Sequence, residues 1–404
     1  MLRKASIPAG TIALSGVLVS SFASPAFADS PADQGTEQLT RWVAMGDSFQ
    51  SGVGAGEYDE ESGDCQRSPL SHVRLLNSDG TIPGELDFVA CSGARIDDLY
   101  AGRHGEAPQL DALDGDGANV SHVSVGIGGN DLDFADNLRD CIVYGWPWAS
   151  CESRFDENVD AAFQELLDQD ANGLNSFQRL YTDIRTATGE GDTQLLAVTY
   201  PKFFPVDGGS DWTSIPTQSR CQGIRVSDQL WINNWVNRLN TAVSESAESV
   251  GAVPLDLYQA SDGHELCNSD GNDPYLNGIQ LNSDAFHPTE FGYARNAEAI
   301  SAQLASVTPQ PVPLRAAPVA ALPEPPTAAV DHTQDGAQVT FDGSGSVPGD
   351  GDIVSYLWEF DDGQLVEGAE VEHTYEPGTY YVTLTVIDSF EEMGFSEPVK
   401  VVVE

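Results

Sequence analysis

Basic residues are scarce in this chain of 404 residues. Lys and Arg together number 18 against 63 Asp and Glu, which gives a formal net charge of −45 at pH 7. A surface of this sign repels the phosphates of nucleic acids and of anionic lipid headgroups, so neither is an expected partner. Only three residues are lysines, namely Lys4, Lys202 and Lys400. Two explanations account equally well for the acidic composition and the small number of lysines. One is adaptation to high salt, and the other is a GC-rich genome that favours arginine codons.

Long apolar runs are also missing after the first 28 residues, so no membrane-spanning segment is expected. The beginning of the chain has the three-part pattern of a secretory signal peptide. Leu2-Arg3-Lys4 is basic, residues 12–22 are apolar, and Ala26-Phe27-Ala28 is a small-x-small cleavage site. We therefore expect residues 1–28 to be removed and the protein to be extracellular.

The sequence contains no Cys-x-x-Cys motif, and the spacing of its cysteines matches no zinc site, so no metal is expected. All six cysteines follow the predicted cleavage site: Cys65, Cys91, Cys141, Cys151, Cys221 and Cys267. In an exported protein such a set predicts a disulfide framework. Their spacing alone does not select one pairing among the many that six cysteines allow.

The composition changes abruptly between Thr308 and Thr327, where seven prolines fall within 20 residues. Prolines at this density favour an extended polyproline II spacer. We expect this linker, residues 308–327, to separate a first domain over residues 38–307 from a second over residues 328–404.

The two regions on either side of the linker have different periodicities. Before it, expected strands at residues 42–45, 87–90, 120–125, 195–199 and 253–257 alternate with helical stretches, of which 158–167 and 226–247 are the clearest. This alternation predicts an α/β fold with a parallel sheet covered on both faces. After it, the runs at 338–341, 354–360 and 378–386 alternate in and out, which predicts a small β-sandwich.

Functional residues of a parallel sheet gather just past the carboxyl ends of the strands. Four such places carry hydrogen-bonding or reactive groups. They are Gly46-Asp47-Ser48 after the first strand, Cys91-Ser92-Gly93 after the second, Gly129-Asn130-Asp131 after the third, and Asp284-Ala285-Phe286-His287 on a loop after the fifth.

These groups can perform acyl transfer. Ser48, between a strand and a helix start, offers an exposed hydroxyl as nucleophile. His287 can take its proton, and Asp284, three residues earlier, can hold the imidazole in the useful tautomer. The N–H groups of Ser48 and Gly93 and the side-chain amide of Asn130 can donate to the developing oxyanion. The sequence thus predicts an ester hydrolase with no cofactor.

The four motifs, in this order, resemble the SGNH (GDSL-type) hydrolase family over roughly residues 41–307. Ala90-Cys91-Ser92-Gly93-Ala94, the six cysteines and the Asp-x-x-His-Pro loop are similar to the secreted actinomycete lipases and esterases of that family. The rival Gly-x-Ser-x-Gly elbow occurs nowhere, which excludes the ordinary α/β-hydrolase signature.

The resemblance implies a flavodoxin-like three-layer α/β/α sandwich. It implies Ser48 as nucleophile, His287 as base, and Ser48, Gly93 and Asn130 as the oxyanion hole. It further implies the disulfides Cys65–Cys91, Cys141–Cys151 and Cys221–Cys267. For the group that orients His287, the resemblance implies either Asp284 or a backbone carbonyl, because some members of the family use a backbone carbonyl in place of the Asp.

Beyond the linker, Tyr356–Gly363 and Gly378–Val386 resemble a PKD domain, which is an Ig-like sandwich. The usual Trp-Asp-Phe-Gly-Asp-Gly is changed here to Trp358-Glu359-Phe360-Asp361-Asp362-Gly363, and we expect Trp358 to be the buried anchor. Such modules on extracellular enzymes imply a spacer or a polysaccharide or surface partner. Asp350-Gly351-Asp352 is interpreted as a turn rather than a Ca²⁺ site.

The sequence leaves the substrate open among lipid, aryl and acetylated-sugar esters. Gly145-Trp146-Pro147-Trp148, beside the Asn130 loop, forms either an apolar wall for an acyl chain or a loop packed on its own disulfide. Trp231 and Trp235 have helical spacing and are predicted to be core residues. We predict a monomeric lipase or esterase; the alternatives are a carbohydrate acetyl esterase and an inactive surface-binding protein.

Overall fold

The structure is a computed structural model of the chain. It describes residues 41–114, 119–134, 137, 140–141, 150–189, 193–206, 208, 224–268, 272–278, 282–306, 316–361 and 364–404. The predicted signal peptide, Cys221, the segment Gly145–Trp148 and the turn residues Asp362 and Gly363 lie outside these ranges, as does the first part of the predicted linker. The described part of the linker is residues 316–327. Residues 316–326 form neither helix nor strand, and Thr327 makes an isolated β-bridge with Val347.

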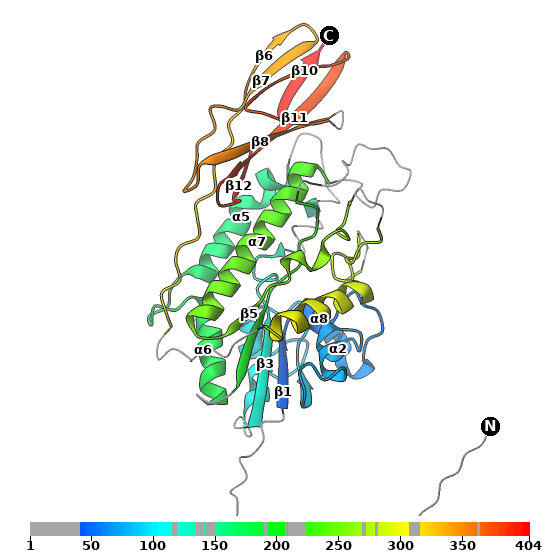
Figure 1. Cartoon of the computed structure of the whole chain (residues 1–404), viewed down its shortest axis with the longest axis vertical. Helices are drawn as coiled ribbons and strands as arrows, with labels where there is room; N and C mark the ends of the chain where they lie inside the picture. Colours follow the sequence, from blue (N-terminus) through cyan, green and yellow to red (C-terminus); the bar gives the residue numbers. More distant parts are fainter. Residues whose placement is uncertain are drawn as a thin grey trace, which may run out of the picture. The chain divides into compact units, whose positions relative to one another are not determined.

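A five-stranded parallel sheet forms the centre of the first domain (Figure 1). Its strands are β1 (Arg41–Gly46), β2 (Glu85–Phe88), β3 (Val120–Gly126), β4 (Gln194–Val198) and β5 (Val253–Leu255). They are arranged in the order β2-β1-β3-β4-β5, and every neighbouring pair is parallel. This is the strand order of a flavodoxin-like sheet, so the predicted fold class is confirmed.

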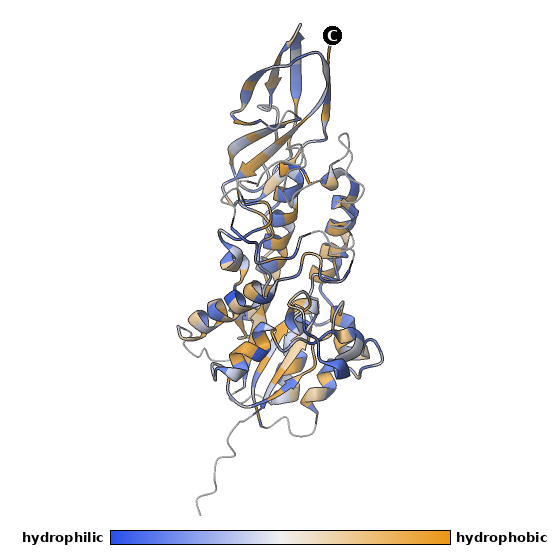
Figure 2. Cartoon of the chain, turned by 90° about the vertical axis from the view of Figure 1, so that its right-hand side faces the viewer, coloured by the Kyte–Doolittle hydropathy of each residue, from blue (hydrophilic) through white to orange (hydrophobic). Residues whose placement is uncertain are grey.

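Helices cover both faces of the sheet because its strands are apolar on both sides. In β1, Val43 and Met45 belong to one buried cluster, whereas Trp42 and Ala44 belong to another on the opposite face. Figure 2 shows these strands largely in the orange of hydrophobic residues. The first cluster includes residues of α3 (Ile96–Ala101), α5 (Cys151–Leu167), α6 (Ser176–Thr188) and α7 (Val226–Ser249), and the second those of α2 (His72–Ser78) and α8 (Glu290–Leu304).

The long helices begin at residues that satisfy their first N–H groups. Ser150 accepts a hydrogen bond from the Ser153 N–H at the start of α5, and Asn175 and Gln178 form a reciprocal capping box at the start of α6. Within the described ranges, the domain also contains the 3₁₀ helices Glu60–Cys65, Gln109–Leu113 and Tyr258–Ser261 and the short α1 (Ser48–Ser51). None of the helices within the described ranges is long and apolar enough to cross a bilayer.

The second domain is antiparallel throughout. One sheet pairs β6 (Asp331–Asp335), β7 (Gln338–Asp342) and β10 (Glu370–Thr374). The other pairs β8 (Ile353–Phe360), β9 (Leu365–Glu367), β11 (Gly378–Asp388), β12 (Met393–Phe395) and β13 (Val399–Val403). Trp358 is fully buried between them, as predicted, and its indole N–H donates to the Gly368 carbonyl at 2.7 Å. This is the expected β-sandwich.

Candidate active site

Ser48 lies at the carboxyl end of β1, at the first position of α1. The preceding Asp47 caps this helix, since its Oδ1 accepts from the Phe49 N–H at 2.9 Å. The turn needs a glycine at position 46. Gly46 has a φ of +134°, and a Cβ on it would lie 2.1 Å from the Gly126 carbonyl oxygen. Its own N–H and carbonyl are both held by the Gln109 side chain.

His287 meets Ser48 across 239 positions of the chain. The imidazole Nε2 is 2.7 Å from the Ser48 Oγ, and Nδ1 is 2.9 Å from the Ala285 carbonyl oxygen. A carbonyl only accepts, so Nδ1 carries the proton and Nε2 is left to accept from the serine hydroxyl. The backbone of Asn277 pairs with that of His287 and of Phe286, and its side chain donates to the Gly54 carbonyl. These bonds attach the histidine loop to the segment just after α1.

The structure differs from the prediction for Asp284. Its carboxylate accepts from the Tyr58 hydroxyl at 2.7 Å and from the Asn282 amide at 2.8 Å, and it makes no hydrogen bond to the imidazole. The Ala285 carbonyl occupies the hydrogen-bonding position at Nδ1 instead. Of the two groups that the resemblance allows, the structure thus places the backbone carbonyl, and not the Asp284 carboxylate, against Nδ1 of His287. The physical reason is the tight turn at Phe286, whose φ of +63° brings the Ala285 carbonyl to the ring.

Asn130 and Gly93, the two predicted oxyanion donors besides Ser48, lie on neighbouring loops. The Asn130 side chain donates one N–H to the carbonyl of Ala94 at 3.0 Å. Because Ala94 follows Gly93 in the chain, this hydrogen bond links the two loops beside the Gly93 N–H. Gly93 has a φ of +72°, and the Arg103 guanidinium covers the side where a Cβ would project. Within the described ranges, no acceptor pairs with the Gly93 N–H. Its donor therefore remains available.

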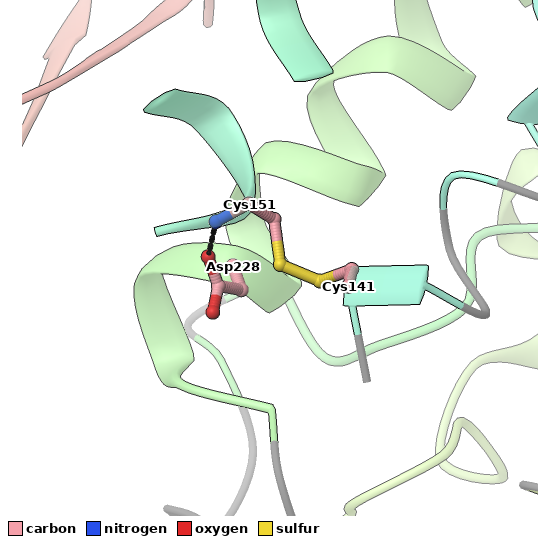
Figure 3. A group of neighbouring side chains, drawn as sticks. All are labelled: Cys141, Cys151 and Asp228. Carbon is pink, nitrogen blue, oxygen red and sulfur yellow. Dashed lines mark hydrogen bonds between the residues drawn. A yellow bond between two sulfur atoms is a disulfide. The ribbon is translucent and has the colours of Figure 1, made fainter. Parts of the chain in front are cut away.

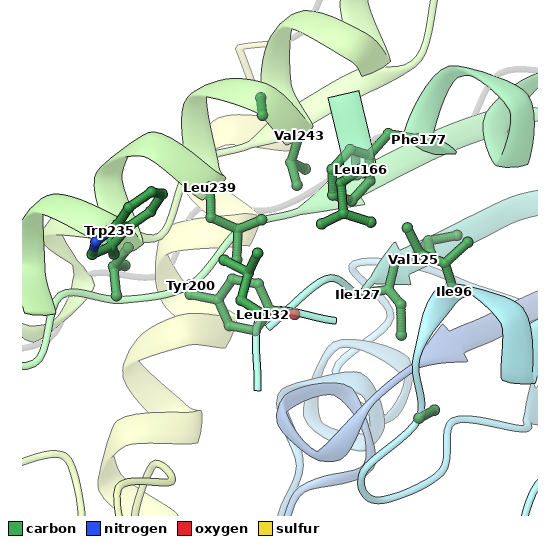
Figure 4. Packing of buried hydrophobic residues seen from close by; sticks show 14 of the residues in the cluster. Ile96, Val125, Ile127, Leu132, Leu166, Phe177, Tyr200, Trp235, Leu239 and Val243 are labelled. Atoms are coloured by element: carbon green, nitrogen blue, oxygen red, sulfur yellow. The ribbon is translucent and has the colours of Figure 1, made fainter. Parts of the chain in front are cut away.

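A pocket brings Ser48, Asn130 and His287 together, whereas Gly93 is not among its lining residues. The cavity is small, about 40 Å³, which leaves room for about three water molecules. Most of its lining residues are apolar: Phe49, Leu132, Phe134, Phe203, Trp235, Val236, Leu239, Ala285 and Phe286. Figure 4 shows part of this packing, including Leu132, Trp235 and Leu239. Such a wall suits the hydrocarbon part of an acyl group.

Removal from water shifts the ionisation of the site. Burial lowers the pKa of His287 to about 4, an effect that the hydrogen bond to the Ala285 carbonyl and the charge of Asp284 only partly offset. The neutral imidazole, which is the form that can accept a proton, therefore persists well below neutral pH. Burial raises the pKa of Asp47 to about 7, although the hydrogen bond from Tyr200 opposes this shift.

Sequence reasoning missed two tyrosines at the site. Tyr58 holds Asp284, and Tyr200 lines the pocket and donates to Asp47 at 2.5 Å. Tyr200 comes two residues after β4, so it too lies just past the carboxyl end of a strand. The same rule that located Ser48 and Asn130 could have found it. No pattern in the sequence signals the role of Tyr58.

Two disulfides constrain segments near the site. Cys65–Cys91 holds the loop that contains Gly93, and Cys141–Cys151 holds the start of α5; both are pairs that the family resemblance implies. Cys267 is also disulfide-bonded, but its expected partner Cys221 lies outside the described residues. Figure 3 shows Asp228 beside Cys141 and Cys151, where it accepts from the Cys151 N–H at 2.6 Å. Because both sulfurs are in the disulfide, this cluster offers no thiolate to a metal.

Comparison with known proteins identifies relatives of both domains. The model of the GDSL-like Lipase/Acylhydrolase family matches residues 44–295, and that of the PKD domain matches residues 318–403. Lipase 1 of Streptomyces coelicolor is 31% identical over 282 residues, which are 69% of this chain and 88% of that protein.

Two solved structures share the fold of the first domain. The extracellular lipase of Streptomyces rimosus is 29% identical with a TM-score of 0.54, and it covers 65% of this chain and 99% of its own. The phospholipase A1 of Streptomyces albidoflavus is 27% identical with a TM-score of 0.51, at the same coverage of both chains.

Replacing Asp284 by Asn should leave ester hydrolysis nearly unchanged. The amide still offers an oxygen to Tyr58, and the imidazole keeps its bond to the Ala285 carbonyl. We expect kcat/KM for p-nitrophenyl acetate within about fivefold of the parent, whereas loss of an orienting carboxylate costs about 10⁴-fold. Tyr58→Phe, which removes the other side of the same contact, is the control. A fall of about a thousandfold in the kcat/KM of Asp284→Asn would contradict this prediction and would show that the carboxylate orients the imidazole.

The low pKa of His287 predicts activity at acid pH. The base must be neutral to accept a proton, and a lowered pKa keeps it neutral down to about pH 4. The pH profile of kcat/KM for a neutral ester should therefore show its acid limb well below 6.5, the ordinary pKa of histidine. Asp47→Asn should keep that limb. A limb near pH 7 that disappears in Asp47→Asn would assign the titration to Asp47 and contradict the prediction.

Proposed function

Since this chain belongs to the GDSL-like lipase/acylhydrolase family and carries a C-terminal PKD domain, we propose that it hydrolyses carboxylic esters through an acyl-enzyme on Ser48. The observation that carries this proposal is the 2.7 Å contact between the Ser48 Oγ and the Nε2 of His287. A nucleophile and a base at this distance need no rearrangement before proton transfer. An apolar pocket beside them supplies a place for the acyl group.

The reaction proceeds in two halves. In the first, the Ser48 oxygen bonds to the ester carbonyl carbon while its proton passes to Nε2 of His287, and the carbonyl oxygen becomes an oxyanion. The N–H groups of Ser48 and Gly93 and the amide of Asn130 are proposed to bind it, each worth about 3 kcal/mol of transition-state stabilisation. The intermediate expels the alcohol, which takes the proton from His287. In the second half, water replaces the serine by the same steps and releases the acid.

The dimensions of the pocket favour a short acyl group. We propose that the acyl group is short, because the pocket beside Ser48 is small, about 40 Å³, and its wall is mainly aromatic and aliphatic. This supports two substrate classes, short-chain esters and acetylated sugars. Acetylated sugars correspond to the alternative function, a carbohydrate acetyl esterase. A PKD domain that binds a polysaccharide would favour this alternative. An inactive surface-binding protein is disfavoured because the contact between Ser48 and His287 is intact.

We propose that the protein is secreted and modular. The proposed parts are a signal peptide at 1–28, a hydrolase domain at 38–307, a linker at 308–327 and a PKD domain at 328–404. Support for secretion comes from the basic and apolar start of the chain, from the disulfides, and from a relative described as an extracellular lipase. A polysaccharide or other surface is the partner proposed for the PKD domain.

Ser48→Ala tests the proposed function. The substitution removes the nucleophile, so turnover of p-nitrophenyl acetate should fall by at least about 1,000-fold. Ser51→Ala is the matched control, because Ser51 is a buried serine of the same helix. Its hydroxyl donates to the Ser48 carbonyl and, within the described ranges, makes no other hydrogen bond. We expect this control within about fivefold of the parent.

The same assay separates the substrate classes. The turnover of the parent enzyme is compared on p-nitrophenyl esters of about two, four, eight and sixteen acyl carbons, whose apolar area increases with chain length. Acetylated xylan is tested beside them. The account predicts a maximum at the shortest esters. Unchanged turnover in Ser48→Ala would overturn the mechanism, and a maximum at the longest ester would overturn the substrate assignment alone.

A further inference from the structure

A buried tyrosine lies between the two loops that carry the proposed nucleophile and the proposed oxyanion donor. Tyr200 follows β4, and its side chain is 5% exposed. In the sheet, β3 separates β4 from β1. The tyrosine side chain therefore extends past the end of β3 to reach Asp47, which follows β1.

The Tyr200 hydroxyl makes one hydrogen bond to each loop. It donates to Oδ2 of Asp47 at 2.5 Å and accepts from the Gly129 N–H at 3.1 Å. Burial raises the pKa of Tyr200 well above its usual value, and the charge of Asp47 adds to this, so the hydroxyl keeps the proton that it donates. A single oxygen thus fixes the distance between two segments 82 positions apart in the sequence, Asp47 and Gly129.

Each end of this link continues directly into the proposed catalytic groups. Asp47 uses its other oxygen, Oδ1, to cap α1, whose first residue is Ser48. Gly129 immediately precedes Asn130. Displacement of the hydroxyl would therefore change the separation between the serine and the Asn130 amide.

Tyr200 is itself held at its backbone and at its ring. The Asn240 side chain of α7 accepts from its backbone N–H at 2.9 Å and donates to its carbonyl at 2.8 Å. The ring of Phe49 packs edge-on against the tyrosine ring, with centroids 5.0 Å apart. Figure 4 shows the ring among the apolar side chains of the core, its hydroxyl oxygen at the far end. A side chain fixed at both its backbone and its ring can transmit position rather than simply fill space.

We propose that Tyr200 is a positioning residue, whose hydroxyl sets the spacing between Ser48 and Asn130 that the tetrahedral intermediate requires. The inference rests on the proposed function for the identities of nucleophile and oxyanion donor. It assigns to Tyr200 no contact with the reacting carbonyl, and it predicts a defect confined to the transition state. The ground-state ester needs only the apolar pocket, in which the phenyl ring remains.

The test is Tyr200→Phe, which removes the hydroxyl oxygen and keeps the ring. Tyr181→Phe is the matched control, because Tyr181 is likewise a buried tyrosine and, within the described ranges, its hydroxyl has no hydrogen-bond partner. Kinetics on p-nitrophenyl acetate are normalised to sites that a fluorophosphonate labels, so that unfolded protein does not count. A boronic acid, which mimics the tetrahedral intermediate on the serine, measures transition-state binding separately.

Tyr200→Phe should lower kcat by about 10- to 100-fold, as expected for a misplacement on the ångström scale, and change KM by less than about threefold. The inhibition constant of the boronic acid should rise by the same factor as kcat falls. Tyr181→Phe should match the parent in all three quantities. A kcat within about threefold of the parent, or equal losses in kcat and in affinity for substrate, would overturn the proposal.

Asn240→Ala provides a second test if Tyr200→Phe does not fold. Within the described ranges, both hydrogen bonds of the Asn240 side chain go to the Tyr200 backbone, so its loss should give the same pattern in kcat and boronic acid binding at smaller amplitude. Parent kinetics in Asn240→Ala would overturn the proposal. Failure of the proposed function is distinguishable, because then Ser48→Ala would retain turnover and the fluorophosphonate would not label the parent at Ser48.

Discussion

The hydrogen bond between Ser48 and His287 is the interaction on which the chemistry of this protein depends. It joins the end of the first strand to a loop near the end of the domain, and neither residue is reactive without the other. Asn277 stabilises this geometry, because it forms hydrogen bonds both to the histidine loop and to the segment that follows α1. The parallel sheet makes this convergence possible, because it delivers every strand's carboxyl end to one edge.

Burial gives the site a consistent electrostatic character. The imidazole is kept neutral by its surroundings and is oriented by a backbone carbonyl, which fixes the tautomer without adding a charge. Asp284 still contributes at longer range, since its charge favours the imidazolium that forms during the reaction. The buried Asp47 carboxylate is bonded to a tyrosine hydroxyl and a backbone N–H, so it is not left unpaired beside the nucleophile.

Sequence reasoning located the strands and the groups at their ends because both follow from local rules. Ser48, Asn130 and His287 could be named from their places after strands, and the pocket contains all three. The direction of the Asp284 carboxylate could not be predicted, because it is set by Tyr58, 226 positions away. Trp235 was predicted as a core residue; it is 4% exposed, yet it also lines the pocket, a role that depends on how α7 lies on the sheet. Helical periodicity identifies a buried face without showing which part of it meets a ligand.

The most direct test of the account is a crystal structure of the protein after reaction with an alkyl fluorophosphonate. The account predicts phosphorus bonded to the Ser48 Oγ, with the phosphoryl oxygen within about 3.1 Å of the N–H groups of Ser48 and Gly93 and of the Asn130 amide. The alkyl group should lie against Leu132, Trp235 and Leu239. An adduct on another residue, or a phosphoryl oxygen turned away from Gly93 and Asn130, would contradict it.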